Sequence, residues 1–259
     1  MKIATWNVNS LSVRLPQLLD WLALEQPDVV ALQETKLVDA KFPHEALAQA
    51  GWQAVCFGQP TYNGVALLSR GAAALDVVRN IPGFDDPLAR VIAGTVDGLR
   101  IVGAYFPNGQ APDSDKFVYK MRWLDALAAW LRTELVQHPE LVLLGDFNIA
   151  PEDRDVYDPE GLRGTIHCTD VERAHFRALL ELGMVDAFRA FEQPDKSWSW
   201  WDYRNLAFRR NQGLRIDHVL VGRALAPALR ACHIDKAPRR NERPSDHAPV
   251  LVELDWPPR

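Results

Sequence analysis

The sequence predicts an α/β protein in which helices cover the outer faces of β-sheets. Many short runs are apolar for four or five residues and then turn polar, as where 29–32 runs into Gln33 and Glu34. Nearly continuous apolar runs are typical of strands buried on both faces. Longer segments between them carry apolar residues at helical spacing, which indicates the covering helices.

The predicted elements follow from these two patterns. Apolar residues share one helical face in 15–24, and the segments 114–135 and 171–182 are also predicted to be helices, with Met121, Trp123 and Trp130 in the core. The predicted strands are 3–6, 29–32, 64–68, 91–96, 101–105, 141–144, 216–221 and 250–254. Polar loops marked by proline or glycine separate them. Because no long linker or repeat interrupts the chain, residues 1–259 are expected to form a single domain.

Composition limits the class of protein. Hydrophobic residues make up 47% and charged residues 24% of the chain, as in a soluble globular protein with a large core. We see no signal peptide and no apolar run of about 18 residues, so no membrane partner is expected. The three cysteines are odd in number and far apart, which favours reduced thiols in a cytoplasmic protein over disulfides or a zinc site.

The charge pattern leaves two interpretations open. A net charge of -5 argues against a protein that coats nucleic acid non-specifically, but a nuclease with a locally acidic cation site stays possible. Arginines gather late in the chain: Arg204, Arg209, Arg210, Arg215, Arg239, Arg240 and Arg243. They form either a solvated surface or a surface that faces phosphates.

Polar side chains follow the ends of several predicted strands. They are Asn7, Glu34, Tyr105, Asp146, Asn148, Asp217, Asp246 and His247. Asp217 lies within an apolar run, where an unpaired carboxylate would cost several kcal/mol, so it needs a partner. His247 is the expected partner, because an Asp bonded to one imidazole nitrogen leaves the other nitrogen free to face a substrate.

These side chains suit phosphodiester hydrolysis with a divalent metal. Glu34 and the aspartates are hard oxygen ligands, which favour Mg²⁺ with Mn²⁺ as a substitute. The chain has no His-x-x-x-His pair and no cysteine cluster, which disfavours zinc. Hydrolysis also needs a base for water and donors to the phosphate oxygens, and this set of side chains contains both.

Eight motifs in order carry a resemblance to a known family. They are Trp6-Asn7-Val8-Asn9, Leu32-Gln33-Glu34-Thr35-Lys36, Asn63-Gly64-Val65-Ala66-Leu67-Leu68-Ser69, Tyr105-Phe106-Pro107-Asn108-Gly109, Gly145-Asp146-Phe147-Asn148-Ile149, Trp200-Trp201-Asp202-Tyr203-Arg204, Leu214-Arg215-Ile216-Asp217-His218 and Ser245-Asp246-His247-Ala248-Pro249. Together they closely resemble the exonuclease III / apurinic endonuclease family of the DNase I-like superfamily. The resemblance runs from the first predicted strand to the last.

The resemblance implies a fold and roles for the site residues. The fold would be a four-layer α/β sandwich, with two mainly antiparallel sheets packed face to face and helices outside. Glu34, with Asn7 and Asp246, would hold the metal. Asp146 would activate or orient the attacking water, unless His247 is the base. Asn148 and Tyr105 would hold the phosphate, and His247, paired with Asp217, would stabilise the transition state.

The resemblance also implies the substrate. The enzyme would act as a monomer on double-stranded DNA, cut 5′ of abasic sites, remove 3′ blocking groups and retain some 3′→5′ exonuclease activity. Trp200 and Leu214 would line a pocket for a sugar without its base, and Asn108 and Lys36 would contact DNA phosphates. Trp201 is expected to be a core residue.

Two other functions share part of this pattern. Another superfamily phosphodiesterase or phosphatase, acting on RNA or phospholipid, would have the same carboxylates and the same Asp–His pair. A DNA-binding module without catalysis is the second alternative, and the presence of every expected catalytic residue type disfavours it.

Overall fold

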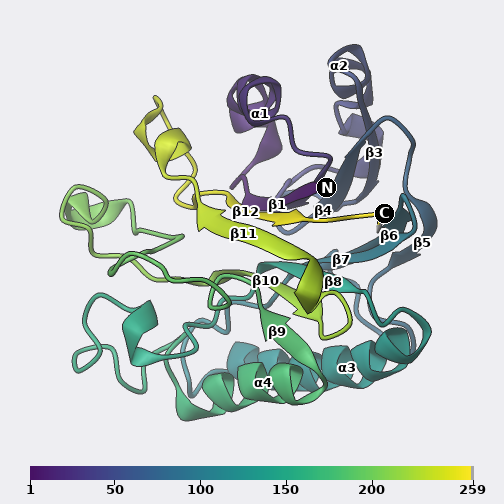
Figure 1. Ribbon diagram of the computed structural model, residues 1–259. Coiled ribbons are helices and arrows are strands. Elements are labelled where there is room, and N and C mark those ends of the chain that lie inside the picture. The colour runs from purple at the N-terminus through teal and green to yellow at the C-terminus, as the bar shows by residue number, and fades with distance from the viewer. Residues whose placement is uncertain (258–259) are drawn as a thin grey trace.

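The computed structural model describes residues 1–257, and its elements form four layers, helices–sheet–sheet–helices (Figure 1). The strands of the first sheet are β1 (Lys2–Asn7), β2 (Val29–Gln33), β3 (Trp52–Phe57), β4 (Val65–Arg70), β11 (Leu229–Ile234) and β12 (Val250–Leu254). Those of the second are β5 (Leu75–Arg79), β6 (Val91–Val96), β7 (Leu99–Tyr105), β8 (Val142–Asp146), β9 (Met184–Asp186) and β10 (Asp217–Gly222). Their orders are β11-β12-β1-β2-β4-β3 and β5-β6-β7-β8-β10-β9.

Each sheet is mainly antiparallel, with one parallel pair near its centre. The parallel pairs are β1 with β2 and β7 with β8. All other neighbouring strands run antiparallel. The predicted four-layer sandwich is therefore confirmed.

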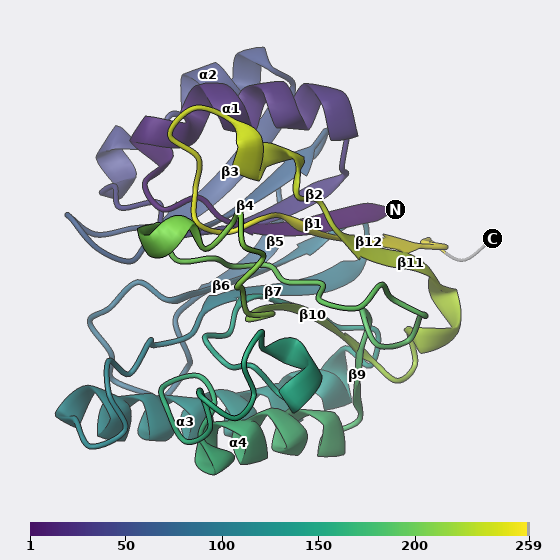
Figure 2. The same cartoon turned by 90° about the vertical axis from the view of Figure 1, so that its left-hand side faces the viewer.

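Helices cover the outer face of each sheet, as Figures 1 and 2 show from two sides. The helices α1 (Leu11–Glu25) and α2 (His44–Gln49) lie on the first sheet, and α3 (Asp115–Gln137) and α4 (Asp170–Glu181) on the second. Ser114 caps α3 by accepting a hydrogen bond from the Phe117 amide, and Thr169 with Glu172 forms a capping box at α4. None of the helices within residues 1–257 is long and apolar enough to cross a membrane.

The central strands are apolar on both faces because each face meets another layer. Val29 and Ala31 of β2 pack into the core between the sheets, whereas Val30 and Leu32 pack against the helices on the outer face. In β8, Val142 and Leu144 enter the central core, while Leu143 packs with α3. This alternation with period two explains the continuous apolar runs of the sequence.

The predicted helices and strands are all present, with small shifts at their ends. Besides the short 3-10 helices, one helix and four strands were not predicted: α2, β3, β5, β9 and β11. The four missed strands are the edge strands of the two sheets. β5, for example, has no buried residue, so its sequence lacks the apolar run by which central strands were recognised.

Candidate active site

The predicted site residues meet at one edge of the sandwich because of the strand directions. The parallel pairs β1/β2 and β7/β8 end at this edge, where they deliver Asn7 and Tyr105 with Asp146. Glu34 follows the last residue of β2. β10 is antiparallel to β8, so its first residue, Asp217, lies directly opposite Asp146. His247 precedes β12, which runs antiparallel to β1 and so starts at the same edge.

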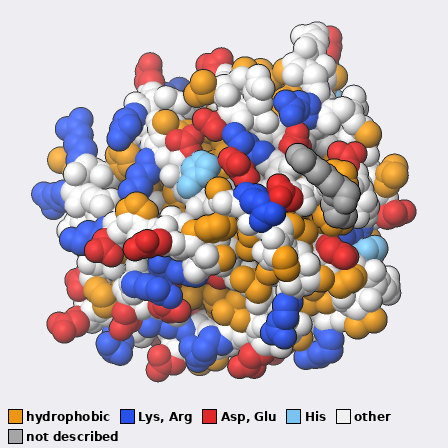
Figure 3. All heavy atoms as spheres, in the orientation of Figure 1, with side chains coloured by type: hydrophobic (Ala, Val, Ile, Leu, Met, Phe, Trp, Pro, Cys, Tyr) orange, Lys and Arg blue, Asp and Glu red, His pale blue; other side chains and the backbone are white. Residues whose placement is uncertain are grey.

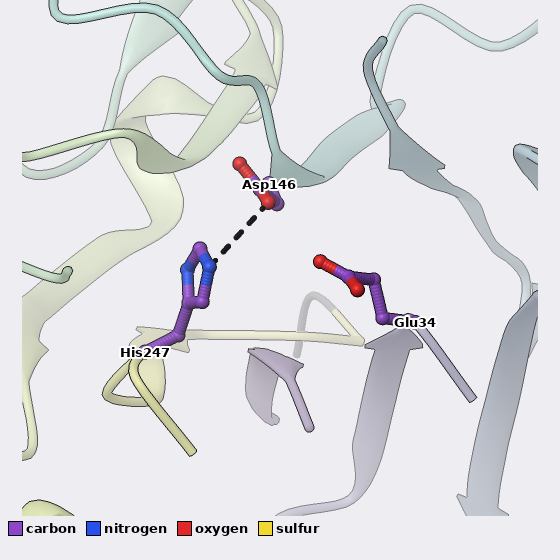
Figure 4. Close-up of side chains that lie close together, drawn as sticks. All are labelled: Glu34, Asp146 and His247. Atoms are coloured by element: carbon purple, nitrogen blue, oxygen red, sulfur yellow. Dashed lines mark ion pairs between the residues drawn. The ribbon is translucent and has the colours of Figure 1, made fainter. Parts of the chain in front are cut away.

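Three ligand-type side chains converge there, as Figure 4 shows. Glu34, Asp146 and His247, which we call the convergent group, each offer a ligand-type atom, and these atoms all lie within 4.8 Å of one another. His247 Nε2 lies 3.7 Å from Asp146 Oδ2. The carboxylate oxygens of Glu34 and Asp146 suit a hard divalent cation, and His247 Nε2 lies beside them.

Asn7 holds the two carboxylates in place. Its Nδ2 donates to Glu34 Oε1 and to Asp146 Oδ2, both at 2.9 Å. Its Oδ1 accepts a hydrogen bond from the backbone amide of Asn9. Asn7 therefore presents nitrogen to the convergent group, and it could offer oxygen to a metal only after its amide turned.

His247 forms the expected pair with Asp217. Its Nδ1 lies 3.0 and 2.9 Å from the two carboxylate oxygens of Asp217. The Ser199 hydroxyl donates to Asp217 Oδ2 at 2.7 Å and so fixes the carboxylate. Burial alone would lower the pKa of His247, but the carboxylates of Asp217, Asp146 and Asp246 outweigh it and raise that pKa to about 10. The imidazole therefore carries its proton at neutral pH, with Nε2 turned toward Asp146.

Asp146 has an unusual carboxyl group. Burial raises its pKa to about 7, with Asp217 and Glu34 adding to the effect and His247 and Asn7 opposing it. A carboxylate with a pKa near neutrality can take up a proton in the working range of an enzyme. The pKa of Tyr105 is raised as well, by burial and by the charges of Glu34 and Asp146, so its phenol stays protonated and can donate a hydrogen bond.

Asn148 and Asn108 lie beside this group on neighbouring loops. Asn148 has a left-handed backbone, with φ 51°, and its amide donates to Asp146 Oδ1 at 2.9 Å. Its side-chain nitrogen donates to the Phe106 carbonyl, and its side-chain oxygen accepts from Asn108 Nδ2 at 3.2 Å. The two amides are thus held together next to Asp146.

Lys36 and Asp246 lie around the convergent group. Lys36 Nζ pairs with Glu34 Oε2 at 3.0 Å and donates to Asn9 Oδ1 at 2.7 Å. Asp246 lies outside the three-residue group, and its oxygens accept hydrogen bonds from Asn9 Nδ2 and Trp200 Nε1, both at 2.9 Å.

Trp200 and Leu214 line a pocket of about 500 Å³ next to these residues, and Asn108 lies on its rim. The two residues pair as a β-bridge, and Trp200 also bridges to His247. Trp201, by contrast, is fully buried, in agreement with its expected core position.

The sequence analysis missed three residues at the site. His167 is buried in the wall of the Trp200 pocket, and its Nδ1 lies 2.8 Å from the Asn148 carbonyl oxygen. Lys120 and Glu172 form a fully buried ion pair beneath the site. His167 belongs to no motif, whereas Lys120 could have been noticed, because its spacing from Phe117, Leu124 and Leu127 places a charge on the apolar face of a helix.

Comparison with known proteins identifies the family. Residues 4–247 match the endonuclease/exonuclease/phosphatase family. The chain belongs to this family. Within it, the chain is 33% identical over 267 residues to exodeoxyribonuclease III of Haemophilus influenzae, an alignment that covers 98% of this chain and 100% of the relative.

Solved structures of other proteins share the fold of this chain. One is the 3′ phosphatase NExo (D146N) from Neisseria bound to a product DNA hairpin, with 52% identity and a TM-score of 0.97, covering 99% of this chain and 100% of that one. Another is an AP endonuclease from Archaeoglobus fulgidus, with 34% identity and a TM-score of 0.94, covering 98% and 99% of the two chains.

Proposed function

We propose that this protein is a divalent-metal-dependent DNA repair phosphodiesterase, which incises the backbone 5′ of abasic sites and removes 3′ blocking groups. The observation that carries the proposal is the convergence of Glu34, Asp146 and the His247–Asp217 pair at one sheet edge. The named relatives act as an exodeoxyribonuclease, a 3′ phosphatase and an AP endonuclease, which supports a DNA substrate. Some 3′→5′ exonuclease activity belongs to the same proposal.

The residues at the site would have different roles in hydrolysis. Glu34 would be the main ligand of Mg²⁺, or of Mn²⁺ in its place, with Asn7 and Asp246 in support. The bound cation would offset the negative charge on a phosphate oxygen. Asp146 would take the proton of the attacking water, since its pKa is raised to about 7 while His247, at about 10, already carries a proton.

The surrounding residues would hold the substrate. His247 Nε2, oriented by Asp217, would donate to a phosphate oxygen, and Tyr105 and Asn148 would position the scissile phosphate. Asn108 and Lys36 would contact neighbouring phosphates. Trp200 and Leu214 would receive a deoxyribose that has lost its base, because removing such a residue from the stack costs little.

Three further inferences belong to the same proposal. We infer that residues 1–259 form one domain and that the protein acts as a monomer. The three cysteines are unbonded and buried, which fits a reducing compartment such as the cytoplasm.

The test uses end-labelled duplexes in Mg²⁺: one with an abasic analogue, one with a 3′ phosphate, one with a recessed 3′ hydroxyl and one undamaged. We expect incision just 5′ of the abasic site and removal of the 3′ phosphate, with slower trimming of the recessed end. Removal of 3′ groups without abasic incision would reject the sugar-pocket role of Trp200 and Leu214. No cleavage of any DNA would favour an RNA or phospholipid substrate.

A further inference from the structure

A second pocket beside the candidate active site is lined by arginine and aromatic side chains. It has a volume of about 460 Å³ and lies between η3 (Arg204–Leu206) and η5 (Ala237–Arg240). Its walls include Tyr203, Leu206, Phe208, Arg209, Arg239 and Arg240, and we call it the arginine pocket. Lys and Arg side chains gather at the left-hand edge of the molecule in Figure 3, where Figure 1 places these segments.

The positive charge of the arginine pocket is not balanced by nearby carboxylates. Arg209 and Arg240 are exposed and form no ion pair among residues 1–257. Asp202, on the pocket wall, pairs with Arg204 at 2.7 Å. Asp246 faces Arg239 from the side of the active site, but its oxygens already accept hydrogen bonds from Asn9 and Trp200.

Arg239 is the fixed centre of the arginine pocket. Only 6% of it is exposed, and its guanidinium lies over the rings of Phe208, Trp201 and Tyr203 at 4.8, 5.7 and 5.8 Å. Its Nη1 donates to the Ser245 carbonyl, but its buried Nε has no hydrogen-bond partner within the described chain. A buried guanidinium that no carboxylate contacts by a hydrogen bond favours an anion as its neighbour.

The arginine pocket adjoins the active site directly. Asp202 and Ala207 line both this pocket and the Trp200–Leu214 pocket. The Tyr203 hydroxyl donates to the Pro244 carbonyl and accepts from Asn9 Nδ2, which also bonds Asp246. An anion bound in the arginine pocket would therefore lie next to the phosphate in the active site, as two phosphates of one DNA duplex do.

We propose that the arginine pocket binds a backbone phosphate of duplex DNA that flanks the cleaved position. This inference rests on the proposed function, because it takes the active-site ligand to be DNA. Arg209 and Arg240 supply exposed donors to the pocket, and the buried Arg239 adds a fixed positive charge. The pocket thus assigns a phosphate-facing role to three of the late arginines of the sequence, Arg209, Arg239 and Arg240.

The test measures how salt weakens binding of an undamaged fluorescent duplex in EDTA, so that no cleavage is required. Neutralising one phosphate contact releases counterions and contributes about 0.9 to the slope of log affinity against log salt. Because the arginine pocket binds one phosphate, we expect the double variant Arg209→Gln/Arg240→Gln to lose about 0.9 from this slope and to bind about tenfold or more weakly at low salt. Arg132→Gln/Arg177→Gln, two exposed arginines on α3 and α4, is the matched control and should keep the wild-type slope.

An unchanged slope in the Arg209/Arg240 variant would overturn the proposal, and so would an equal loss in the control. A loss seen with an RNA duplex but not with DNA would also overturn it. Because binding is measured without metal, the outcome is separate from that of the proposed function. A wild-type protein that binds duplex DNA but cleaves none would contradict the function and leave the arginine pocket testable.

Discussion

At the scale of single residues, the site depends on two buried groups whose pKa values are both raised. Asp146 and His247 lie 3.7 Å apart, with the pKa of one raised to about 7 and the other to about 10. Asp217 contributes most to the raised pKa of His247, because its negative charge, held in place by a hydrogen bond from Ser199, lies on the far side of the imidazole. Asp146 can thus accept a proton, and His247 can donate a hydrogen bond.

The Asp146→Asn variant tests the first half of this arrangement. The amide has nearly the same shape but accepts a proton poorly, so we expect the turnover number to fall by about three orders of magnitude or more. Duplex affinity should stay within a few-fold, because Asn7 and Asn148 still hold the site. Single-turnover cleavage and fluorescence anisotropy measure the two quantities, and a collapse of binding would make Asp146 a structural group.

His218 tests the electrostatics of the buried interior. Burial, with Arg215 in addition, lowers its pKa to about 4, below the ordinary value of 6.5. The unfolded chain therefore binds one more proton than the folded chain between these pH values. The contribution of His218 to stability is present above pH 6.5 and is lost as the pH falls through this window.

We expect the unfolding free energy of the wild type to fall more steeply below pH 6.5 than that of His218→Asn. The difference in slope should approach about 1.4 kcal/mol per pH unit near the middle of the window. Urea unfolding at a series of pH values measures it. Parallel curves for the two proteins would show that His218 is not held neutral.

The sequence identified the residues that carry chemistry but not those that support them. Asp217 was recognisable because a carboxylate in an apolar run needs a partner, and the structure contains that pair. His167 was not recognisable, because an isolated histidine in a polar loop has no periodicity or motif to mark it. Its position depends on a contact with Asn148, 19 residues away, which no local pattern encodes.

At the scale of elements, helices α3 and α4 on the second sheet support the loops that carry Asn108 and Asn148. Lys120 of α3 donates to the carbonyl oxygens of Asn148 at 2.7 Å and of Asn108 at 3.2 Å. It also pairs with Glu172 of α4, whose carboxylate accepts from the His167 and Thr169 amides. One buried cation thus links two helices to the two asparagines at the site.

Lys120→Met should therefore affect both stability and turnover. It leaves the Glu172 carboxylate buried without a cation, so we expect the unfolding free energy to fall by about 3–5 kcal/mol. Adding Glu172→Gln should restore much of the stability but not the turnover, because the two carbonyls still lack their donor. Urea unfolding and kcat are compared with Arg122→Met, an exposed change on the same helix. Turnover that recovered together with stability would contradict this role.

Central strands were predictable and edge strands were not, for one physical reason. A central strand such as β2 is covered on both faces and must be apolar throughout. The edge strands β3 and β11 mix buried with exposed positions, β5 has no buried residue, and β9 has only three residues. Their sequences therefore resemble loops, and only pairing with a neighbour makes them strands.

At the scale of the whole molecule, the two ends of the chain complete one sheet. β1 pairs with β12, and the Met1 amino group donates to the Leu254 carbonyl at 2.7 Å. The core between the sheets takes residues from both halves of the chain, including Ile3, Val142 and Val252. The strand order could not be predicted from the sequence, because such pairings join residues about as far apart as the chain allows.

A shared core predicts that the chain unfolds as one unit. We expect a single transition in urea, with coincident curves from far-ultraviolet circular dichroism and tryptophan fluorescence. Trp21 packs on the first sheet and Trp130 on the second, so tryptophan fluorescence reports on both sheets. Two separated transitions would show that the sheets belong to independent domains.

We propose that this edge of the sandwich hydrolyses DNA with a divalent cation. The most direct test is the rate of incision of an abasic duplex as Mg²⁺ is titrated into EDTA-treated protein. We predict no incision until free Mg²⁺ is present, then a saturable rise, and no such rise for Glu34→Gln over the same range. Incision that persisted in excess EDTA, or a Glu34→Gln variant with the wild-type Mg²⁺ dependence, would contradict the account.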